Sequence, residues 1–241
     1  KWFGCLAYSE IFEPPDRVKV HPRMIPYMTY DRMQWIVPDA RAAAEELTQR
    51  WAQASPVVGW YDYIYGAAYL VPRVYPHVMA EHYRFAYENG VRGLTAEAYP
   101  NFGEGPKLYV SLKLQWDPAQ DVDTLLDEWY NLAVGREAAP YVKKYYDHWE
   151  DFWTKRIRDS RWLPKGRQYL PFNMPTYLED VTLAEIAQSR KWLESAVAAA
   201  ATPQQKARAK LLLRAFEYYE SSAVAYPRQT RIPTLNSEEA A

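Results

Sequence analysis

Several features that would indicate common classes of protein are scarce or missing in this sequence. A single cysteine, Cys5, among 241 residues excludes an internal disulfide framework and leaves the redox compartment open. No segment reaches the roughly 20 apolar residues of a membrane span. A net charge of −1 provides no basic surface for nucleic acid and no polybasic segment for a membrane. We therefore expect neither nucleic acid nor a membrane among the partners.

Motifs of the common cofactor and nucleophile sites are also missing. The sequence has no GxGxxG, no P-loop pattern and no GxSxG. Its four histidines are scattered, and the closest pair, His77 and His82, is spaced to lie on different faces of a helix. Cys5 is expected to be a buried apolar residue rather than a nucleophile. We expect no metal and no organic cofactor.

Aromatic residues with a polar group are abundant instead. The chain has 10 Trp and 21 Tyr but only 7 Phe. Trp and Tyr combine a flat apolar face with a hydrogen-bonding group, which suits a partly wet surface that holds a ligand. Sugars bind to such surfaces because their C–H faces stack on aromatic rings. A tyrosine-rich core would have the same composition, so this count alone does not separate the two interpretations.

The first 115 residues alternate between strand-like and helix-like segments. Strands are expected at 4–9, 24–30, 57–64 and 91–97, with helices at 39–54 and 75–90. Strands that alternate with helices of this length predict βα units on a parallel sheet. Four such units make half of a (β/α)8 barrel, or most of a doubly wound sheet.

The rest of the chain is expected to be helical. Two capping boxes, Thr182 with Glu185 and Thr202 with Gln205, predict an antiparallel helix pair over 182–226. The last residues, 227–241, have the composition of a loose tail. The domains predicted are 1–160, which carries the sheet, and 161–226, which is helical.

Acidic residues follow each of the four strand-like segments. They are Glu10, Asp31, Asp62 and Glu97. In a parallel α/β barrel, the carboxyl ends of the strands form the edge where the active site lies. Glycosidic bonds are cleaved by a pair of carboxyl groups, one acting as the acid and the other as base or nucleophile. Each acid could equally be the N-cap of the following helix, Asp31 above all.

The segment "GWYDYIYG" surrounds one of these acids with aromatic rings. Alternation along a strand groups Trp60 with Asp62 on one face and Tyr61 with Tyr63 on the other. We predict that Asp31, Asp62 and Glu97 converge on one cleft as catalytic residues. The substrate-binding residues predicted around them are Trp60, Tyr61, Tyr63, Tyr99, Asn101, Tyr8 and Glu10.

Several segments together resemble the DUF4838 family of large, mostly bacterial proteins that are predicted to be glycoside hydrolases. The shared features are the aromatic–acid strand "GWYDYIYG", "NGVRG" at 89–93, "EAY" at 97–99, the "LQWDPAQDVDTLLD" segment at 114–127 and "VGREAAP" at 134–140. The similarity covers roughly residues 1–160. The motifs identify the family when they are taken together, although no single motif would.

The resemblance implies a fold and a set of site residues. The family is similar to the α-glucuronidase and β-hexosaminidase clans, whose catalytic domain is a (β/α)8 barrel. This chain would then be the second half of the barrel, strands five to eight, followed by an α-helical region. Asp31 and Asp62 are the loose counterparts of the base carboxylates, with Asp at 62 where the α-glucuronidases have Glu. The general acid of those enzymes comes from the fourth strand of the barrel, which would lie in the first half and so outside this chain.

We therefore expect part of a longer glycoside hydrolase that acts on a plant or microbial polysaccharide or oligosaccharide. Hydrolysis would use carboxyl groups at the strand ends, and the rest of the longer chain would contact this half. Two alternatives stay open: a non-catalytic carbohydrate-binding protein on the same scaffold, and a structural module in which the aromatics are only core. The sequence leaves the compartment open, with secretion or a periplasmic location among the options.

Overall fold

The computed structural model describes residues 1–163 and 169–228, which form a mixed α/β fold. Its sheet has four strands: β1 (Phe3–Ala7), β2 (Met24–Tyr30), β3 (Val58–Tyr63) and β4 (Val91–Glu97). All neighbouring pairs are parallel and the order is β1-β2-β3-β4. This confirms the prediction that the four segments are parallel neighbours in sequence order.

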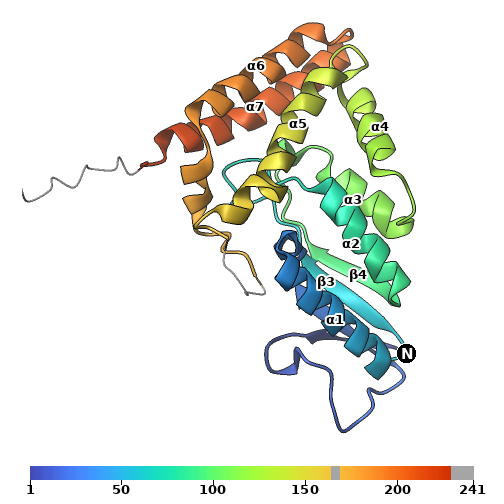
Figure 1. The fold of residues 1–241 in the computed structure, drawn as a ribbon. Helices are drawn as coiled ribbons and strands as arrows, with labels where there is room; N and C mark the ends of the chain where they lie inside the picture. Colours follow the sequence, from blue (N-terminus) through green and yellow to red (C-terminus); the bar gives the residue numbers. More distant parts are fainter. Residues whose placement is uncertain (164–168, 229–241) are drawn as a thin grey trace, which may run out of the picture.

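Helices cover one face of this sheet. Helices α1 (Pro38–Ala54) and α2 (Pro76–Glu88) connect the strands and lie side by side over it (Figure 1). Each begins with proline in its first turn, where no backbone N–H is needed. On this side Trp60 of β3 packs against Phe85 of α2, with ring centroids 6.4 Å apart. The hydrophobic core of the sheet therefore lies between β3 and these two helices.

The opposite face of the sheet is much less covered. Leu6 of β1 is 45% exposed, Thr95 of β4 is exposed and Tyr27 of β2 is half-buried. The Tyr27 ring lies flat across the neighbouring strand, and a Cβ added at Gly59 would come within 2.6 Å of it. Cβ atoms at Gly4 and Gly93 would each approach the same side chain to 3.1 Å. A tyrosine fits here because three strands present glycine beneath it.

Helix α3 (Lys107–Trp116) packs beside α2 (Figure 1). The remaining helices form a layer beyond the carboxyl ends of the strands: α4 (Val122–Val134), α5 (Ala139–Thr154), α6 (Leu183–Ala199) and α7 (Pro203–Ala225). Helices α6 and α7 form the predicted antiparallel pair, and both predicted capping boxes are present. The apolar side chains between these two helices are buried at Ile186, Leu193, Leu212, Phe216 and Tyr219, and Trp192 is half-buried.

Short 3₁₀ helices occupy several connections. They are η1 (Ser9–Ile11), η2 (Arg32–Ile36), η3 (Phe102–Glu104), η4 (Arg156–Asp159) and η5 (Pro175–Asp180). Strand β1 ends earlier than predicted, at Ala7, so Glu10 lies within η1 rather than at a strand end. The predicted tail at 227–241 lies outside the described residues beyond Arg228, and the division at residue 160 stays a prediction. In the described parts of the chain, no helix has both the length and the apolarity to cross a membrane.

Candidate active site at the carboxyl ends of the strands

Two of the predicted catalytic acids lie in one row of the sheet. Tyr30 pairs with Asp62 and Tyr63 with Glu97 in the parallel register, so Asp31 lies opposite Tyr63. Asp31, Tyr63 and Glu97 thus occupy equivalent positions at the ends of three neighbouring strands. Because strands are about 4.8 Å apart, the backbones of the two acids are separated by about 10 Å.

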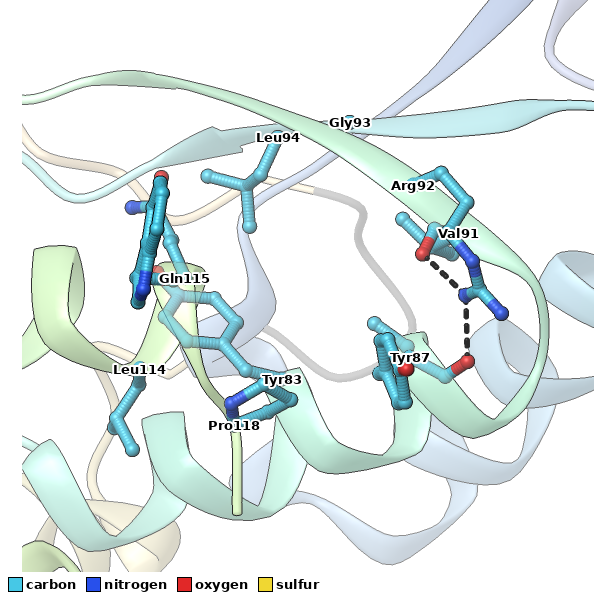
Figure 2. Close-up of a pocket in the computed structure, with 11 residues that line it drawn as sticks. Tyr83, Tyr87, Val91, Arg92, Gly93, Leu94, Leu114, Gln115 and Pro118 are labelled. Carbon is cyan, nitrogen blue, oxygen red and sulfur yellow. Dashed lines mark hydrogen bonds between the residues drawn. The ribbon is translucent and has the colours of Figure 1, made fainter. Parts of the chain in front are cut away.

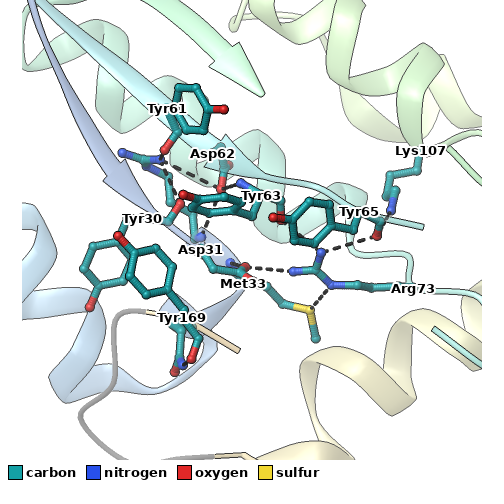
Figure 3. Close-up of polar contacts among 12 residues, drawn as sticks. Tyr30, Asp31, Met33, Tyr61, Asp62, Tyr63, Tyr65, Arg73, Lys107 and Tyr169 are labelled. Carbon is teal, nitrogen blue, oxygen red and sulfur yellow. Dashed lines mark hydrogen bonds and ion pairs between the residues drawn. The ribbon is translucent and has the colours of Figure 1, made fainter. Parts of the chain in front are cut away.

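Asp31 is almost fully buried and holds two roles at once. It is the N-cap of η2, where its Oδ1 accepts a hydrogen bond from the Met33 backbone N–H at 3.3 Å. The same oxygen accepts from Arg73 Nη2 at 2.7 Å (Figure 3). Burial raises the pKa of Asp31 from 3.8 to about 6, against the opposing charge of Arg73. Asp31 can therefore carry a proton in mildly acidic conditions.

Arg73 is the residue that fixes Asp31 in place. Its guanidinium is fully buried and also donates to the Tyr63 carbonyl at 2.9 Å, so it ties Asp31 to the end of β3. The rings of Tyr69 and Tyr75 lie 4.8 and 5.2 Å from its central carbon. These cation–π contacts suit a guanidinium that has lost its water.

Glu97 is held by tyrosine hydroxyls. Tyr61 donates to Oε1 at 2.7 Å and Tyr65 donates to Oε2 at 2.8 Å. An ionised carboxylate only accepts hydrogen bonds, so two O–H donors suit its charged form. The hydrogen bond to Glu97 also raises the pKa of Tyr61 to about 12, because a phenolate there would face the carboxylate.

A small aromatic cavity opens above Asp31. Its volume is about 190 Å³, and its lining consists of Tyr8, Asp31, Tyr63, Tyr65, Tyr169, Leu170 and Phe172. The rings form a continuous set, with centroids of neighbouring pairs 5.3 to 5.8 Å apart. The hydroxyl of Tyr169 is buried and has no hydrogen-bond partner within the described residues. It is therefore a buried polar group beside the cavity that lacks a partner in the described parts of the chain.

Asp62 and Trp60 lie on the other face of β3, as alternation requires. Asp62 accepts from the backbone N–H groups of Arg32 at 3.1 Å and of Tyr63 at 2.8 Å, and it lies 3.8 Å from the Arg32 guanidinium. It is 3% exposed and does not line the cavity, so the three acids do not share one cleft. The prediction that Trp60 stacks on a sugar is wrong, because its ring is fully buried beneath Arg32.

The other predicted binding residues are distributed around the same edge. Tyr8 is 45% exposed and lines the cavity, whereas Glu10 is exposed and does not. Tyr99 is 61% exposed and its ring lies 5.5 Å from that of Tyr65. The Asn101 side chain is occupied as the N-cap of η3, accepting from the Gly103 backbone N–H.

Backbone strain marks the same edge of the sheet. Non-glycine residues with positive φ are Ser9 (54°), Ala68 (71°) and Tyr99 (34°) among those described. Each follows the carboxyl end of a strand: β1, β3 and β4 respectively. Such strain costs free energy and tends to be kept at functional sites. Two of these loops line the cavity, through Tyr8 and Tyr65, and the third carries Tyr99, whose ring contacts Tyr65.

The predicted site residues did not include five that the structure places there: Arg73, Tyr65, Tyr169, Leu170 and Phe172. Tyr65 follows the same alternation as Tyr61 and Tyr63, so the pattern could have identified it. Arg73 lies in an irregular loop, and Tyr169 and Phe172 come from a connection more than 100 residues after β3. No local pattern in the sequence indicates that these residues return to the strand ends.

Other polar clusters are less suited to chemistry. His77 links two helices through Glu150 at 2.8 Å and Asp123 at 3.4 Å, and it lies outside the site. No group of three or more His, Cys, Asp or Glu residues suited to a metal ion occurs in the described portion of the chain. A second cavity of about 190 Å³ lies beside the outer edge of β4 (Figure 2).

The fold and the site define a mixed α/β protein with a parallel sheet and an aromatic cavity beside Asp31 at its strand ends. The chain matches the family model described as "Domain of unknown function (DUF4838)" over residues 1–147, and it belongs to that family. It matches no curated protein and no solved structure.

Proposed function

We propose that this chain is part of a glycoside hydrolase in which Asp31 and Glu97 form the carboxyl pair. The observation that carries the proposal is their placement on one face of the sheet, on either side of Tyr63. Asp31 lines the aromatic cavity, and Glu97 accepts a hydrogen bond from Tyr65, which also lines it. Glycosidases use two carboxyl groups separated by roughly 5 to 10 Å, according to whether they retain or invert the anomeric centre. A backbone separation of about 10 Å is compatible with that range.

The two acids differ in the way that such a pair requires. Asp31, with its pKa raised to about 6, is suited to donate a proton to the leaving oxygen. Glu97, which accepts two tyrosine hydrogen bonds, is suited to act as the base or the nucleophile. Arg73 acts as a positioning residue for Asp31, and the tyrosines Tyr61 and Tyr65 do the same for Glu97.

The cavity has the chemistry of a sugar site. The rings of Tyr8, Tyr65 and Phe172 supply apolar faces. The hydroxyl of Tyr169, which has no partner among the described residues, is the group to which we assign a sugar hydroxyl. No charged side chain other than Asp31 lines the cavity within the described residues. The cavity therefore favours a sugar unit recognised through hydroxyl groups and ring faces.

We further propose that the sheet is half of a (β/α)8 barrel, completed by a longer form of the chain. Parallel sheets are almost always covered on both faces, and here α1 and α2 cover only one. The uncovered face carries Leu6, Tyr27 and Thr95, which would point into the barrel. Beside the outer edge of β4, Leu94, Tyr87 and Trp116 border a cavity that a further strand would fill (Figure 2).

The test is hydrolysis of glycosides by the longer protein and its Asp31→Asn and Glu97→Gln variants. Each variant is expected to lose at least about 100-fold in turnover, as for removal of one acid–base group. Glu88→Gln, which changes an exposed carboxylate on α2, serves as the control. Wild-type turnover in both site variants, with unchanged circular dichroism, would refute the carboxyl pair. Sugar binding without any turnover in the wild type would instead identify a non-catalytic carbohydrate-binding protein.

A further inference from the structure

A groove, separate from the two cavities described above, lies on the surface between η3 and α7. Its volume is about 530 Å³, within the range of ligand-binding clefts. The residues that line it are Asn101, Phe102, Leu211, Arg214, Ala215 and Tyr218. Phe102 is 54% exposed and Tyr218 is 52% exposed, so two aromatic rings face solvent in one hollow. The groove combines apolar faces with polar groups, as the first cavity does.

The aromatic side of the groove is rigid before any ligand binds. Asn101 and Glu104 form a capping box around η3, so the loop that carries Phe102 has fixed ends. Tyr146 of α5 donates to the Gly103 carbonyl at 3.1 Å. The Tyr219 ring packs so closely on Gly103 that a Cβ there would come within 2.3 Å of it. A fixed backbone loses little conformational entropy on binding, which favours affinity.

The groove is physically connected to the cavity above Asp31. Lys107 donates to the Tyr65 carbonyl at 2.9 Å and forms a buried ion pair with Glu104. Glu104 in turn accepts from the Asn101 backbone N–H at 3.3 Å. On the surface, the exposed Tyr99 ring contacts Tyr65 and lies two residues before Asn101. The same short segment of chain therefore borders both sites.

Arg214 gives the groove an available hydrogen-bond donor. It is exposed on α7, and it has no ion-pair or hydrogen-bond partner among the residues that the structure describes. A guanidinium presents five N–H donors in a planar fork. It can bond to the hydroxyl groups of a neutral sugar or to the carboxylate of an acidic one.

We infer that this groove is a second sugar subsite, which binds a neighbouring unit of the oligosaccharide whose end occupies the cavity above Asp31. The inference rests on the proposed function. The first cavity, at about 190 Å³, is too small for a long ligand, so further units must lie along the surface. Tyr99 leads from that cavity to the groove, where Phe102 and Tyr218 offer stacking faces and Arg214 offers donors. The ligand is then an oligosaccharide or polysaccharide chain rather than a single sugar.

The experiment measures affinity by calorimetry against sugars of one to four units, with the protein carrying its complete barrel. The probes are the xylo-, manno- and galacturono-oligosaccharide series, so that neutral and acidic chains are compared. The variants are Phe102→Ala/Tyr218→Ala and Arg214→Gln, with Leu132→Ala as the control. Leu132 is 65% exposed on α4 and lines neither site. All these side chains are exposed, so the variants are expected to fold with unchanged melting temperatures.

The expected result is a wild-type affinity that increases with chain length in at least one series. The double variant should lose about tenfold for the longer sugars and nothing for the monosaccharide, as for removal of aromatic contacts in a binding site. Arg214→Gln should weaken galacturono-chains more than neutral ones if it binds a carboxylate, and equally if it binds hydroxyls. An unchanged length dependence in the double variant would overturn the second subsite and leave the proposed function standing. Absence of binding to all three series by the wild type would overturn both.

Discussion

The raised pKa of Asp31 predicts an unusual dependence of stability on pH. In the unfolded chain this carboxyl titrates near its ordinary value of 3.8, whereas in the folded protein its pKa is about 6. Between these two values the folded state binds more protons than the unfolded state, so stability falls as pH rises through this window. One pKa unit corresponds to about 1.4 kcal/mol, so the fall caused by Asp31 is up to about 3 kcal/mol.

Asp31→Asn should remove this fall, because asparagine does not titrate. The free energy of unfolding of the variant, relative to wild type, should therefore rise by up to about 3 kcal/mol from pH 4 to pH 7.5. The assay is urea denaturation, followed by tryptophan fluorescence, at several pH values in this range. Asp16→Asn, an exposed carboxylate between β1 and β2, controls for the exchange of Asp for Asn.

The opposite sign would refute the reasoning. If the Arg73 ion pair outweighed burial, the pKa of Asp31 would be lowered in the folded state. Wild type would then gain stability relative to Asp31→Asn as pH rises from 4. The same outcome would remove the basis for assigning Asp31 as the proton donor, because a carboxyl of low pKa holds no proton near neutral pH.

Three further predictions concern the scaffold. Arg32→Met should lower the free energy of unfolding by about 3 to 5 kcal/mol, because it leaves Asp62 buried without its cation; a loss under 1 kcal/mol in urea titrations would contradict this. His77→Gln should abolish a loss of wild-type stability between pH 7 and pH 9. The hydrogen bond to Glu150 raises the pKa of His77 to about 9, so the stability that His77 contributes is complete below about pH 6.5 and disappears as pH rises through 9. Parallel stability profiles of wild type and variant against pH would contradict this. Thr182→Ala should cost about 1 kcal/mol by calorimetric melting, since its side chain caps α6, and no change would mean that the cap is replaced by water.

Much of the fold was predictable because it rests on local patterns. Alternation along β3 correctly separated Trp60 and Asp62 from Tyr61 and Tyr63, and the two capping boxes correctly located the starts of α6 and α7. The prediction that Trp60 and Asp62 belong to the site was wrong, because they lie on the face of the sheet that the helices cover. Alternation says that Asp62 and Tyr63 point in opposite directions, but it does not say which direction the helices cover.

The contents of the site were harder to predict for a different reason. Arg73 neutralises Asp31 from a loop 42 residues further along the chain, and Tyr169 reaches the cavity from beyond α5. These contacts depend on how loops fold back over the sheet, which no periodicity encodes. The sequence analysis treated an N-cap and a site residue as alternatives for Asp31. The two are compatible, because Asp31 caps η2 and also lines the cavity.

The tyrosine that lies across three glycines has a consequence for how this family can vary. Because Gly59 cannot accept a Cβ while the Tyr27 ring occupies its place, the two positions must change together. Among homologues we expect covariation: a smaller residue at 27 should accompany alanine or serine at 59, and the same rule should hold more weakly at Gly4 and Gly93. In a laboratory library, changes at these positions should be strongly non-additive. Substitutions on this face of the sheet are therefore coupled, because the single ring of Tyr27 restricts which side chains three strands can accommodate.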